Sequence, residues 1–130
     1  MATLAEALKA LDREDRIDAL ISVAERFVNE PTHPEEARVP GCESEAFVWS
    51  EPAPNGKMTL HFAVENPQGI SAMALAALLK EVTAGASIQS IAAIPEGVVV
   101  ELFGDELSMG KTMGLTGMVK MVAGEAKKRL

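Results

Sequence analysis

The sequence predicts an α+β fold in which a small antiparallel sheet is covered by helices. Residues 57–65 alternate apolar and polar side chains, which is typical of a half-buried β-strand. The apolar face comprises Met58, Leu60, Phe62 and Val64. Asn55-Gly56 precedes this segment and favours a hairpin turn after another apolar strand. Helical periodicity occupies most of the remaining chain, so helices are the available cover for one face of the hairpin.

Length and composition indicate one domain over residues 1–130, because this size and a hydrophobic content of 48% suffice for a real core. The net charge of −7 argues against nucleic acid, which needs a basic surface. No segment approaches the roughly 18 apolar residues of a membrane span. Met1–Ala10 also lacks the basic and apolar regions of a secretory signal. We therefore expect a cytoplasmic protein that binds neither nucleic acid nor a membrane.

Two helices are predicted before the hairpin. Thr3 and Glu6 have the spacing of a capping box, and leucines follow them at helical intervals. The second helix is expected to begin after Asp12 and to end near Asn29, because two prolines follow. Its apolar stripe comprises Ile17, Leu20, Ile21, Ala24, Phe27 and Val28. Residues 30–38 are predicted to form a polar loop that leads to the cysteine.

The first strand of the hairpin is expected over residues 44–50. After the second strand, Ser71 is expected to cap a helix over residues 72–84, which Gly85 ends. This helix is apolar on nearly every face, so we expect it to be central and buried. A short helix should follow from Ser87, because isoleucines recur at helical spacing.

Residues 97–104 are ambiguous, since their propensity favours a strand while their shortness and flanking glycines leave a helical turn open. The last helix is expected from Met109 to Lys127. Its inner stripe comprises Leu115, Met118, Val119 and Val122. It also contains four glycines, each costing up to about 1 kcal/mol relative to alanine. These glycines are Gly110, Gly114, Gly117 and Gly124. They indicate close approach of another backbone, for which the cysteine loop is a candidate.

Cys42 is the main candidate for chemistry. It is the single cysteine of the chain, and Pro40-Gly41 place it at a turn that leads into an apolar strand. A lone cysteine is more often a small buried hydrophobic residue, but this one does not belong to an apolar periodic segment. Glu43 and Glu45 disfavour the thiolate, so we expect a thiol that is activated by a partner. An internal disulfide is excluded.

Other chemical sites are weakly indicated. His33 and His61 are candidate bases, but a cysteine–histidine pair depends on a proximity that the sequence does not give. One cysteine and two histidines show no ligand spacing for a metal, so neither metal nor cofactor is predicted. Gly110-Lys111-Thr112 ends like a phosphate-binding loop but lacks the required earlier glycine. Lys111 is a cation that could approach the thiol, although a solvated surface lysine is the more common case.

The stretch around Cys42 resembles the signature of the SufE family of sulfur acceptors, Val/Ile-x-Gly-Cys-x-Ser-x-x-Trp. The matching residues are Val39, Gly41, Cys42, Ser44 and, slightly displaced, Trp49. Residues 107–115 are similar to the Leu-x-Pro-x-Arg-x-x-Gly-Leu segment that opens the last helix of the family. Met109 stands at the proline and Lys111 at the arginine, and lysine cannot make the forked contacts of arginine. The resemblance extends through most of the chain.

The resemblance implies a SufE/IscU-like fold with a short helix near residues 98–103. It implies that Cys42 accepts persulfide sulfur from a pyridoxal-phosphate cysteine desulfurase (SufS-like) and stimulates that enzyme. The sulfur would then pass to an iron–sulfur scaffold complex (SufBCD-like), which makes the chain a sulfur carrier rather than a stand-alone enzyme. A monomer and a homodimer both remain open. The alternative is a non-catalytic adaptor of an iron–sulfur assembly complex, whereas an iron–sulfur scaffold would need about three ligating cysteines.

Overall fold

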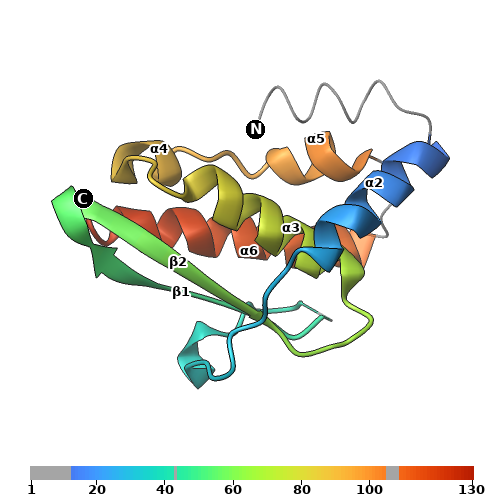
Figure 1. The fold of residues 1–130 in the computed structure, drawn as a ribbon, viewed down its shortest axis with the longest axis horizontal. Helices are drawn as coiled ribbons and strands as arrows, with labels where there is room; N and C mark the ends of the chain where they lie inside the picture. The colour runs from blue at the N-terminus through green and yellow to red at the C-terminus, as the bar shows by residue number, and fades with distance from the viewer. Residues whose placement is uncertain (1–12, 43, 105–108) are drawn as a thin grey trace.

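The computed structural model describes residues 13–42, 44–104 and 109–130, and the first predicted helix lies outside these ranges. The elements are α2 (Arg13–Glu25), η1 (Glu35–Ala37), β1 (Ala46–Ala53), η2 (Pro54–Gly56), β2 (Lys57–Val64), α3 (Ile70–Thr83), α4 (Ile88–Ala92), α5 (Val98–Phe103) and α6 (Met109–Lys127). In Figure 1, α3 and α6 lie between the hairpin and the short helices α4 and α5. The predicted α+β fold is confirmed. No helix in the described ranges is long and apolar enough to span a membrane.

The two strands form the predicted antiparallel hairpin, in a register that runs from Ala46 opposite Val64 to Ala53 opposite Lys57. The connection needs only three residues, because Asn55 (φ 64°) and Gly56 (φ 70°) both adopt left-handed backbone conformations. Strand β1 (Ala46–Ala53) begins two residues later and ends three residues later than the predicted range of residues 44–50. Its last part contains a proline, which a strand at the edge of a sheet tolerates.

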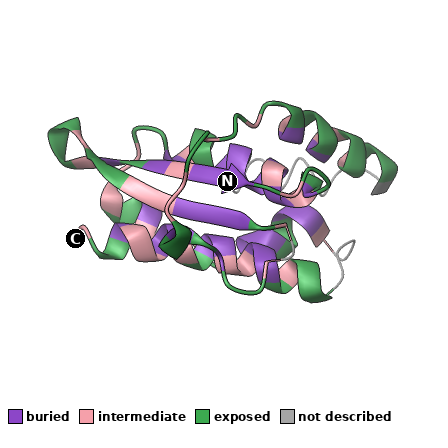
Figure 2. Ribbon diagram, turned by 90° about the horizontal axis from the view of Figure 1, so that it is seen from below, coloured by how far each residue is buried: buried purple, intermediate pink, exposed green. Residues whose placement is uncertain are grey.

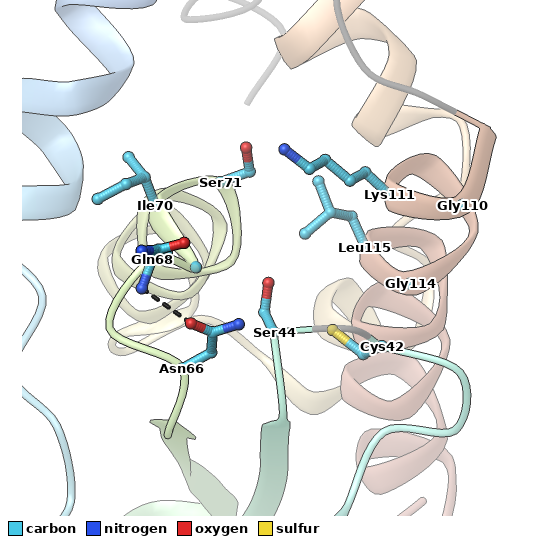
Figure 3. Close-up of a pocket in the computed structure, with 11 residues that line it drawn as sticks. Cys42, Ser44, Asn66, Gln68, Ile70, Ser71, Gly110, Lys111, Gly114 and Leu115 are labelled. Atoms are coloured by element: carbon cyan, nitrogen blue, oxygen red, sulfur yellow. Dashed lines mark hydrogen bonds between the residues drawn. The ribbon is translucent and has the colours of Figure 1, made fainter.

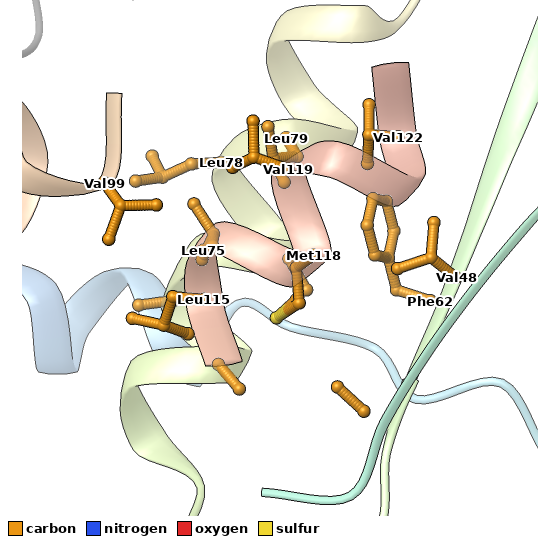
Figure 4. Close-up of a cluster of buried hydrophobic side chains, with 14 of the residues drawn as sticks. Val48, Phe62, Leu75, Leu78, Leu79, Val99, Leu115, Met118, Val119 and Val122 are labelled. Atoms are coloured by element: carbon orange, nitrogen blue, oxygen red, sulfur yellow. The ribbon is translucent and has the colours of Figure 1, made fainter. Parts of the chain in front are cut away.

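The inner face of the hairpin forms the core with α3 and α6. All four predicted core residues of β2 are at most 4% exposed. Figure 4 shows Leu75 and Leu79 of α3 beside Met118 and Val119 of α6, with Phe62 of β2 next to them. Most residues of α3 are buried, as its apolar sequence predicted.

The outer face of the hairpin is also covered near the cysteine, which the sequence did not indicate. Three consecutive residues at the start of β1 and three at the end of β2 are buried, whereas the tip is exposed (Figure 2). The predicted loop over residues 30–38 supplies this cover. The ring of His33 stacks on Phe47 with centroids 3.7 Å apart, and Ala37 joins Phe47 and Ala63 in a small second apolar cluster.

Helix α2 is shorter than predicted, because it ends at Glu25 and not near Asn29. The side-chain amide of Asn29 donates to the carbonyl of Val64 at 2.8 Å and accepts from its N–H at 3.1 Å, so the chain turns toward the hairpin. The expectation that Val28 belongs to the core is wrong, since it is 84% exposed. Of the predicted stripe, Leu20 and Ala24 are buried. Ile17 and Ile21 are exposed.

The remaining helices differ from expectation at two points. Ser71 does not cap α3, because Gly69 occupies the N-cap position. Residues 98–103 are helical despite their strand propensity, because burial of Val98, Val99, Leu102 and Phe103 follows helical spacing. The short helix predicted after Ser87 is present as α4, and Ser87 caps it by accepting from the N–H of Ser90 at 3.1 Å. Helix α6 covers the predicted range from Met109 onward.

The C-terminal end of α6 is joined to β1 through Ser50. Its hydroxyl donates to Glu125 Oε1 at 2.8 Å and accepts from Arg129 Nε at 3.1 Å. Burial of Glu125 opposes its ionisation, but hydrogen bonds from Lys128 and Ser50 and the charges of Lys128 and Arg129 together lower the pKa of this carboxyl. The ionised form therefore stabilises the folded state.

The Glu125→Gln substitution should lower the free energy of unfolding at pH 7 by about 1.5 kcal/mol, the lower end of the range for hydrogen bonds to a charged group. A carboxyl whose pKa is lowered by folding contributes stability above its unfolded pKa and loses it as the pH falls through its folded pKa. The difference between wild type and variant should therefore vanish as the pH falls well below 4.5, the ordinary value. Urea denaturation from pH 3 to pH 7 measures it. A difference that is constant with pH would contradict this prediction.

Candidate functional site

Cys42 lies in a short loop that is closed by backbone hydrogen bonds. The N–H of Val39 donates to the carbonyl of Ala46 at 2.8 Å, and the N–H of Glu45 donates to the carbonyl of Cys42 at 3.1 Å. Gly41 has φ 69°, so the turn predicted before the cysteine needs the freedom of glycine. Glu45 also adopts a left-handed backbone, with φ 55°. The loop thus presents Cys42 at a fixed point just before β1.

The turn after β2 holds one side of this loop. The N–H groups of Glu65 and Asn66 donate to the carbonyls of Glu45 and Ser44, at 3.1 and 3.2 Å. A Cβ atom on Gly69 would lie 2.9 Å from Ser44 Cβ, closer than packed carbon atoms approach. The loop therefore rests against Gly69, where a side chain would displace it.

Helix α6 holds the other side of the loop. A Cβ atom on Gly114 would lie 3.1 Å from Cys42 Cα and 3.4 Å from Cys42 Sγ, and one on Gly117 would lie 3.0 Å from Val39 Cγ1. The predicted close approach of the cysteine loop is confirmed at these two glycines. It is wrong for Gly124, which has open space in the direction of a Cβ atom.

A cavity of about 360 Å³ opens beside Cys42 (Figure 3). Cys42 and Ser44, the turn after β2, the start of α3 and the first turns of α6 line it. The lining residues are Cys42, Ser44, Asn66, Gln68, Gly69, Ile70, Ser71, Gly110, Lys111, Gly114 and Leu115. Cys42 is partly exposed, and Figure 3 shows its sulfur turned toward Ser44 and the cavity.

The electrostatics of this cavity favour a negatively charged occupant. The start of α3 lies at its wall, and the N-terminal end of a helix carries a partial positive charge. Lys111 lines the cavity, and Figure 3 shows its side chain extending across the opening toward Ser71. Lys111 thus shares the cavity with Cys42.

Neither histidine lines the cysteine cavity. His33 Nε2 lies 2.5 Å from Glu65 Oε1, while His61 Nδ1 lies 2.8 Å from Glu30 Oε1 and its ring stacks on Trp49 across the hairpin. The structure therefore does not form the cysteine–histidine pair that the sequence left open. Among the residues described, no group of three or more histidine, cysteine or carboxylate side chains could hold a metal ion.

The second wall of the cavity is the part that sequence reasoning missed. Asn66, Gln68, Ile70 and Ser71 contribute to it, with the Asn66 side chain accepting from the N–H of Gln68 at 2.9 Å. The register of the hairpin could have indicated this wall. Continuing that register two residues beyond the ends of the strands places Ser44 beside Asn66, so the turn after β2 must lie next to the cysteine loop.

The chain matches the SufE family, described as an Fe-S metabolism associated domain, over residues 2–126. A solution structure of a hypothetical protein from Thermus thermophilus is similar, with 26% sequence identity and a TM-score of 0.76. The match covers 98% of this chain and 93% of the Thermus chain. No curated protein matches. The chain therefore belongs to the SufE family of Fe-S metabolism associated domains.

Proposed function

We propose that this protein is a sulfur carrier that accepts persulfide sulfur on Cys42 from a pyridoxal-phosphate cysteine desulfurase. It then delivers the sulfur to an iron–sulfur cluster scaffold and, by removing sulfur from the desulfurase, stimulates that enzyme. The observation that carries the proposal is a single, partly exposed cysteine at the mouth of a cavity in a chain of the SufE family.

The chemistry needs only the thiol of Cys42 and the persulfide of the partner. The thiolate of Cys42 attacks the terminal sulfur of the desulfurase persulfide, and a new sulfur–sulfur bond forms on Cys42. The original sulfur–sulfur bond breaks, and its electron pair leaves with the cysteine thiolate of the desulfurase. One persulfide is lost and one is gained, so no external oxidant or reductant is required. Delivery to a scaffold thiol repeats the same exchange.

The cavity supports the carrier role, because a persulfide is one sulfur longer than the thiol and needs room beside Cys42. The space of about 360 Å³ is ample for one sulfur atom. The start of α3 and Lys111 favour the anionic form in which a persulfide exists near neutral pH. A cytoplasmic location, where thiols are kept reduced, fits this role.

Incubation with a cognate desulfurase and free cysteine should add one sulfur atom to wild-type protein, at Cys42. Intact-protein mass spectrometry followed by peptide mapping measures this addition. The Cys42→Ser variant should gain no sulfur, because a hydroxyl cannot hold a persulfide at this position. Sulfur found at another residue, or none on the wild type under conditions in which the desulfurase is active, would overturn the proposal.

A further inference from the structure

We infer that Gly114, assisted by Gly117, is a positioning residue that sets how deeply Cys42 is sheltered. The function of this glycine seat rests on the proposed sulfur transfer, but its geometry can be tested without any partner. We define the glycine seat as the surface of α6 formed by Gly114 and Gly117, against which the cysteine loop lies.

The first argument is the tightness of the contact. A Cβ atom on Gly114 would lie 3.1 Å from Cys42 Cα, which is tighter than nine in ten real contacts of this kind. The neighbour is a backbone atom, so it cannot rotate away as the end of a flexible side chain can. A methyl group at position 114 therefore requires the backbone of Cys42 to move away from α6 by a few tenths of an ångström. On Gly117 the nearest neighbour is Val39 Cγ1 at 3.0 Å, which has more freedom to adjust.

The second argument is where the loop is anchored. Val39 at its start is hydrogen-bonded to Ala46, and Ser44 and Glu45 at its end are hydrogen-bonded to the turn after β2. The contacts at the glycine seat are van der Waals contacts, and their attraction weakens steeply when the atoms move apart by even a small distance. The N–H of Glu45 also donates to the carbonyl of Cys42, so Cys42 can shift relative to α6 as far as this bond and the two anchored ends of the loop allow. The seat then governs the balance between a sheltered and an accessible sulfur.

The third argument is that α6 accepts an energetic cost at these positions. Glycine in a helix interior is less favourable than alanine, and both glycines lie within a helix of 19 residues. Gly124 lies in the same helix with open space in the direction of a Cβ atom. Replacing it with alanine therefore changes the helix propensity without changing any contact to the cysteine loop. It is a matched control for both positions.

The test is the rate at which iodoacetamide alkylates Cys42 in the purified full chain, followed by intact mass spectrometry. Gly114→Ala should raise this rate at least about fivefold, because the displaced loop exposes the sulfur. Gly117→Ala should raise it less, about twofold to threefold, and it carries the test if Gly114→Ala does not fold. Gly124→Ala should leave the rate within about 1.5-fold of wild type and raise Tm by a few degrees, as expected for glycine to alanine in a helix.

A second control separates seating from stability. Val122→Ala removes a fully buried core side chain from α6 beyond the seat, so it should lower Tm without changing the alkylation rate under native conditions. Alkylation that follows Tm across the four variants, or equal rates for Gly114→Ala and Gly124→Ala, would overturn the inference. If Cys42 takes up no sulfur yet the alkylation pattern holds, the proposed function fails and the seat stands. If sulfur is taken up but all rates are equal, the seat fails and the proposed function stands.

Discussion

Replacing Cys42 with alanine should abolish the stimulation of a cognate cysteine desulfurase while leaving the two proteins able to bind each other. Turnover of free cysteine should fall to the rate of the desulfurase alone, because no thiolate remains to remove its persulfide sulfur. The dissociation constant should change by no more than about twofold, since the substitution removes one sulfur atom from a partly exposed side chain. Steady-state alanine production and isothermal titration calorimetry measure the two quantities.

This pair of measurements separates a carrier from a non-catalytic adaptor. An adaptor would act by binding alone, so the Cys42→Ala variant would stimulate the desulfurase as well as wild type does. Val28→Ala is a suitable control, because Val28 is 84% exposed and does not line the cysteine cavity. It should leave both stimulation and binding unchanged. Full stimulation by the alanine variant would contradict the carrier role and favour the adaptor.

Local patterns were sufficient to predict most of the fold. Alternation along β2 and the Asn55-Gly56 pair specify the hairpin, because a two-residue period and a left-handed turn have few other uses. The unbroken apolar sequence of α3 identifies it as the central helix. These features depend on neighbours in the sequence, which a single chain displays directly.

Features that depend on distant contacts could not be predicted in the same way. Val28 belongs to a helical apolar stripe by spacing, yet it is exposed because Asn29 turns the chain toward Val64. The cover of His33 over Phe47 also requires a loop to fold back on the hairpin, and a polar loop sequence gives no sign of it. Residues 98–103 are helical because their burial follows helical spacing, although their propensity favours a strand.

The candidate site was predicted on one side only. The turn before Cys42 and the glycines of α6 were readable because both are unusual in their local setting. The other wall, formed by the turn after β2 and the start of α3, consists of residues that are ordinary for a turn. Only the hairpin register brings them to the cysteine. Extending the hairpin register beyond the ends of β1 and β2 therefore identifies the two loops that together form the cavity.

The Leu75→Ala substitution should lower the free energy of unfolding by about 3 kcal/mol, the largest stability change that we predict. Leu75 is fully buried in the middle of α3, where it packs with the core side chains of α6 (Figure 4). Removing it leaves a cavity that close-packed neighbours fill only in part. Urea denaturation followed by circular dichroism measures the change.

Val28→Ala is the matched comparison, because the sequence predicted Val28 to lie on the apolar stripe of a helix, as it predicted the helix that contains Leu75 to be buried, and the structure buries only Leu75. Its effect should stay within about 0.5 kcal/mol, as for exposed positions in general. Similar losses for the two variants would contradict the exposure described for Val28 and the burial described for Leu75. Because α3 also begins at the wall of the cysteine cavity, loosening its core should disturb the site that its first residues line. Helix α3 thus contributes both to the stability of the core and to the wall of the cavity beside Cys42.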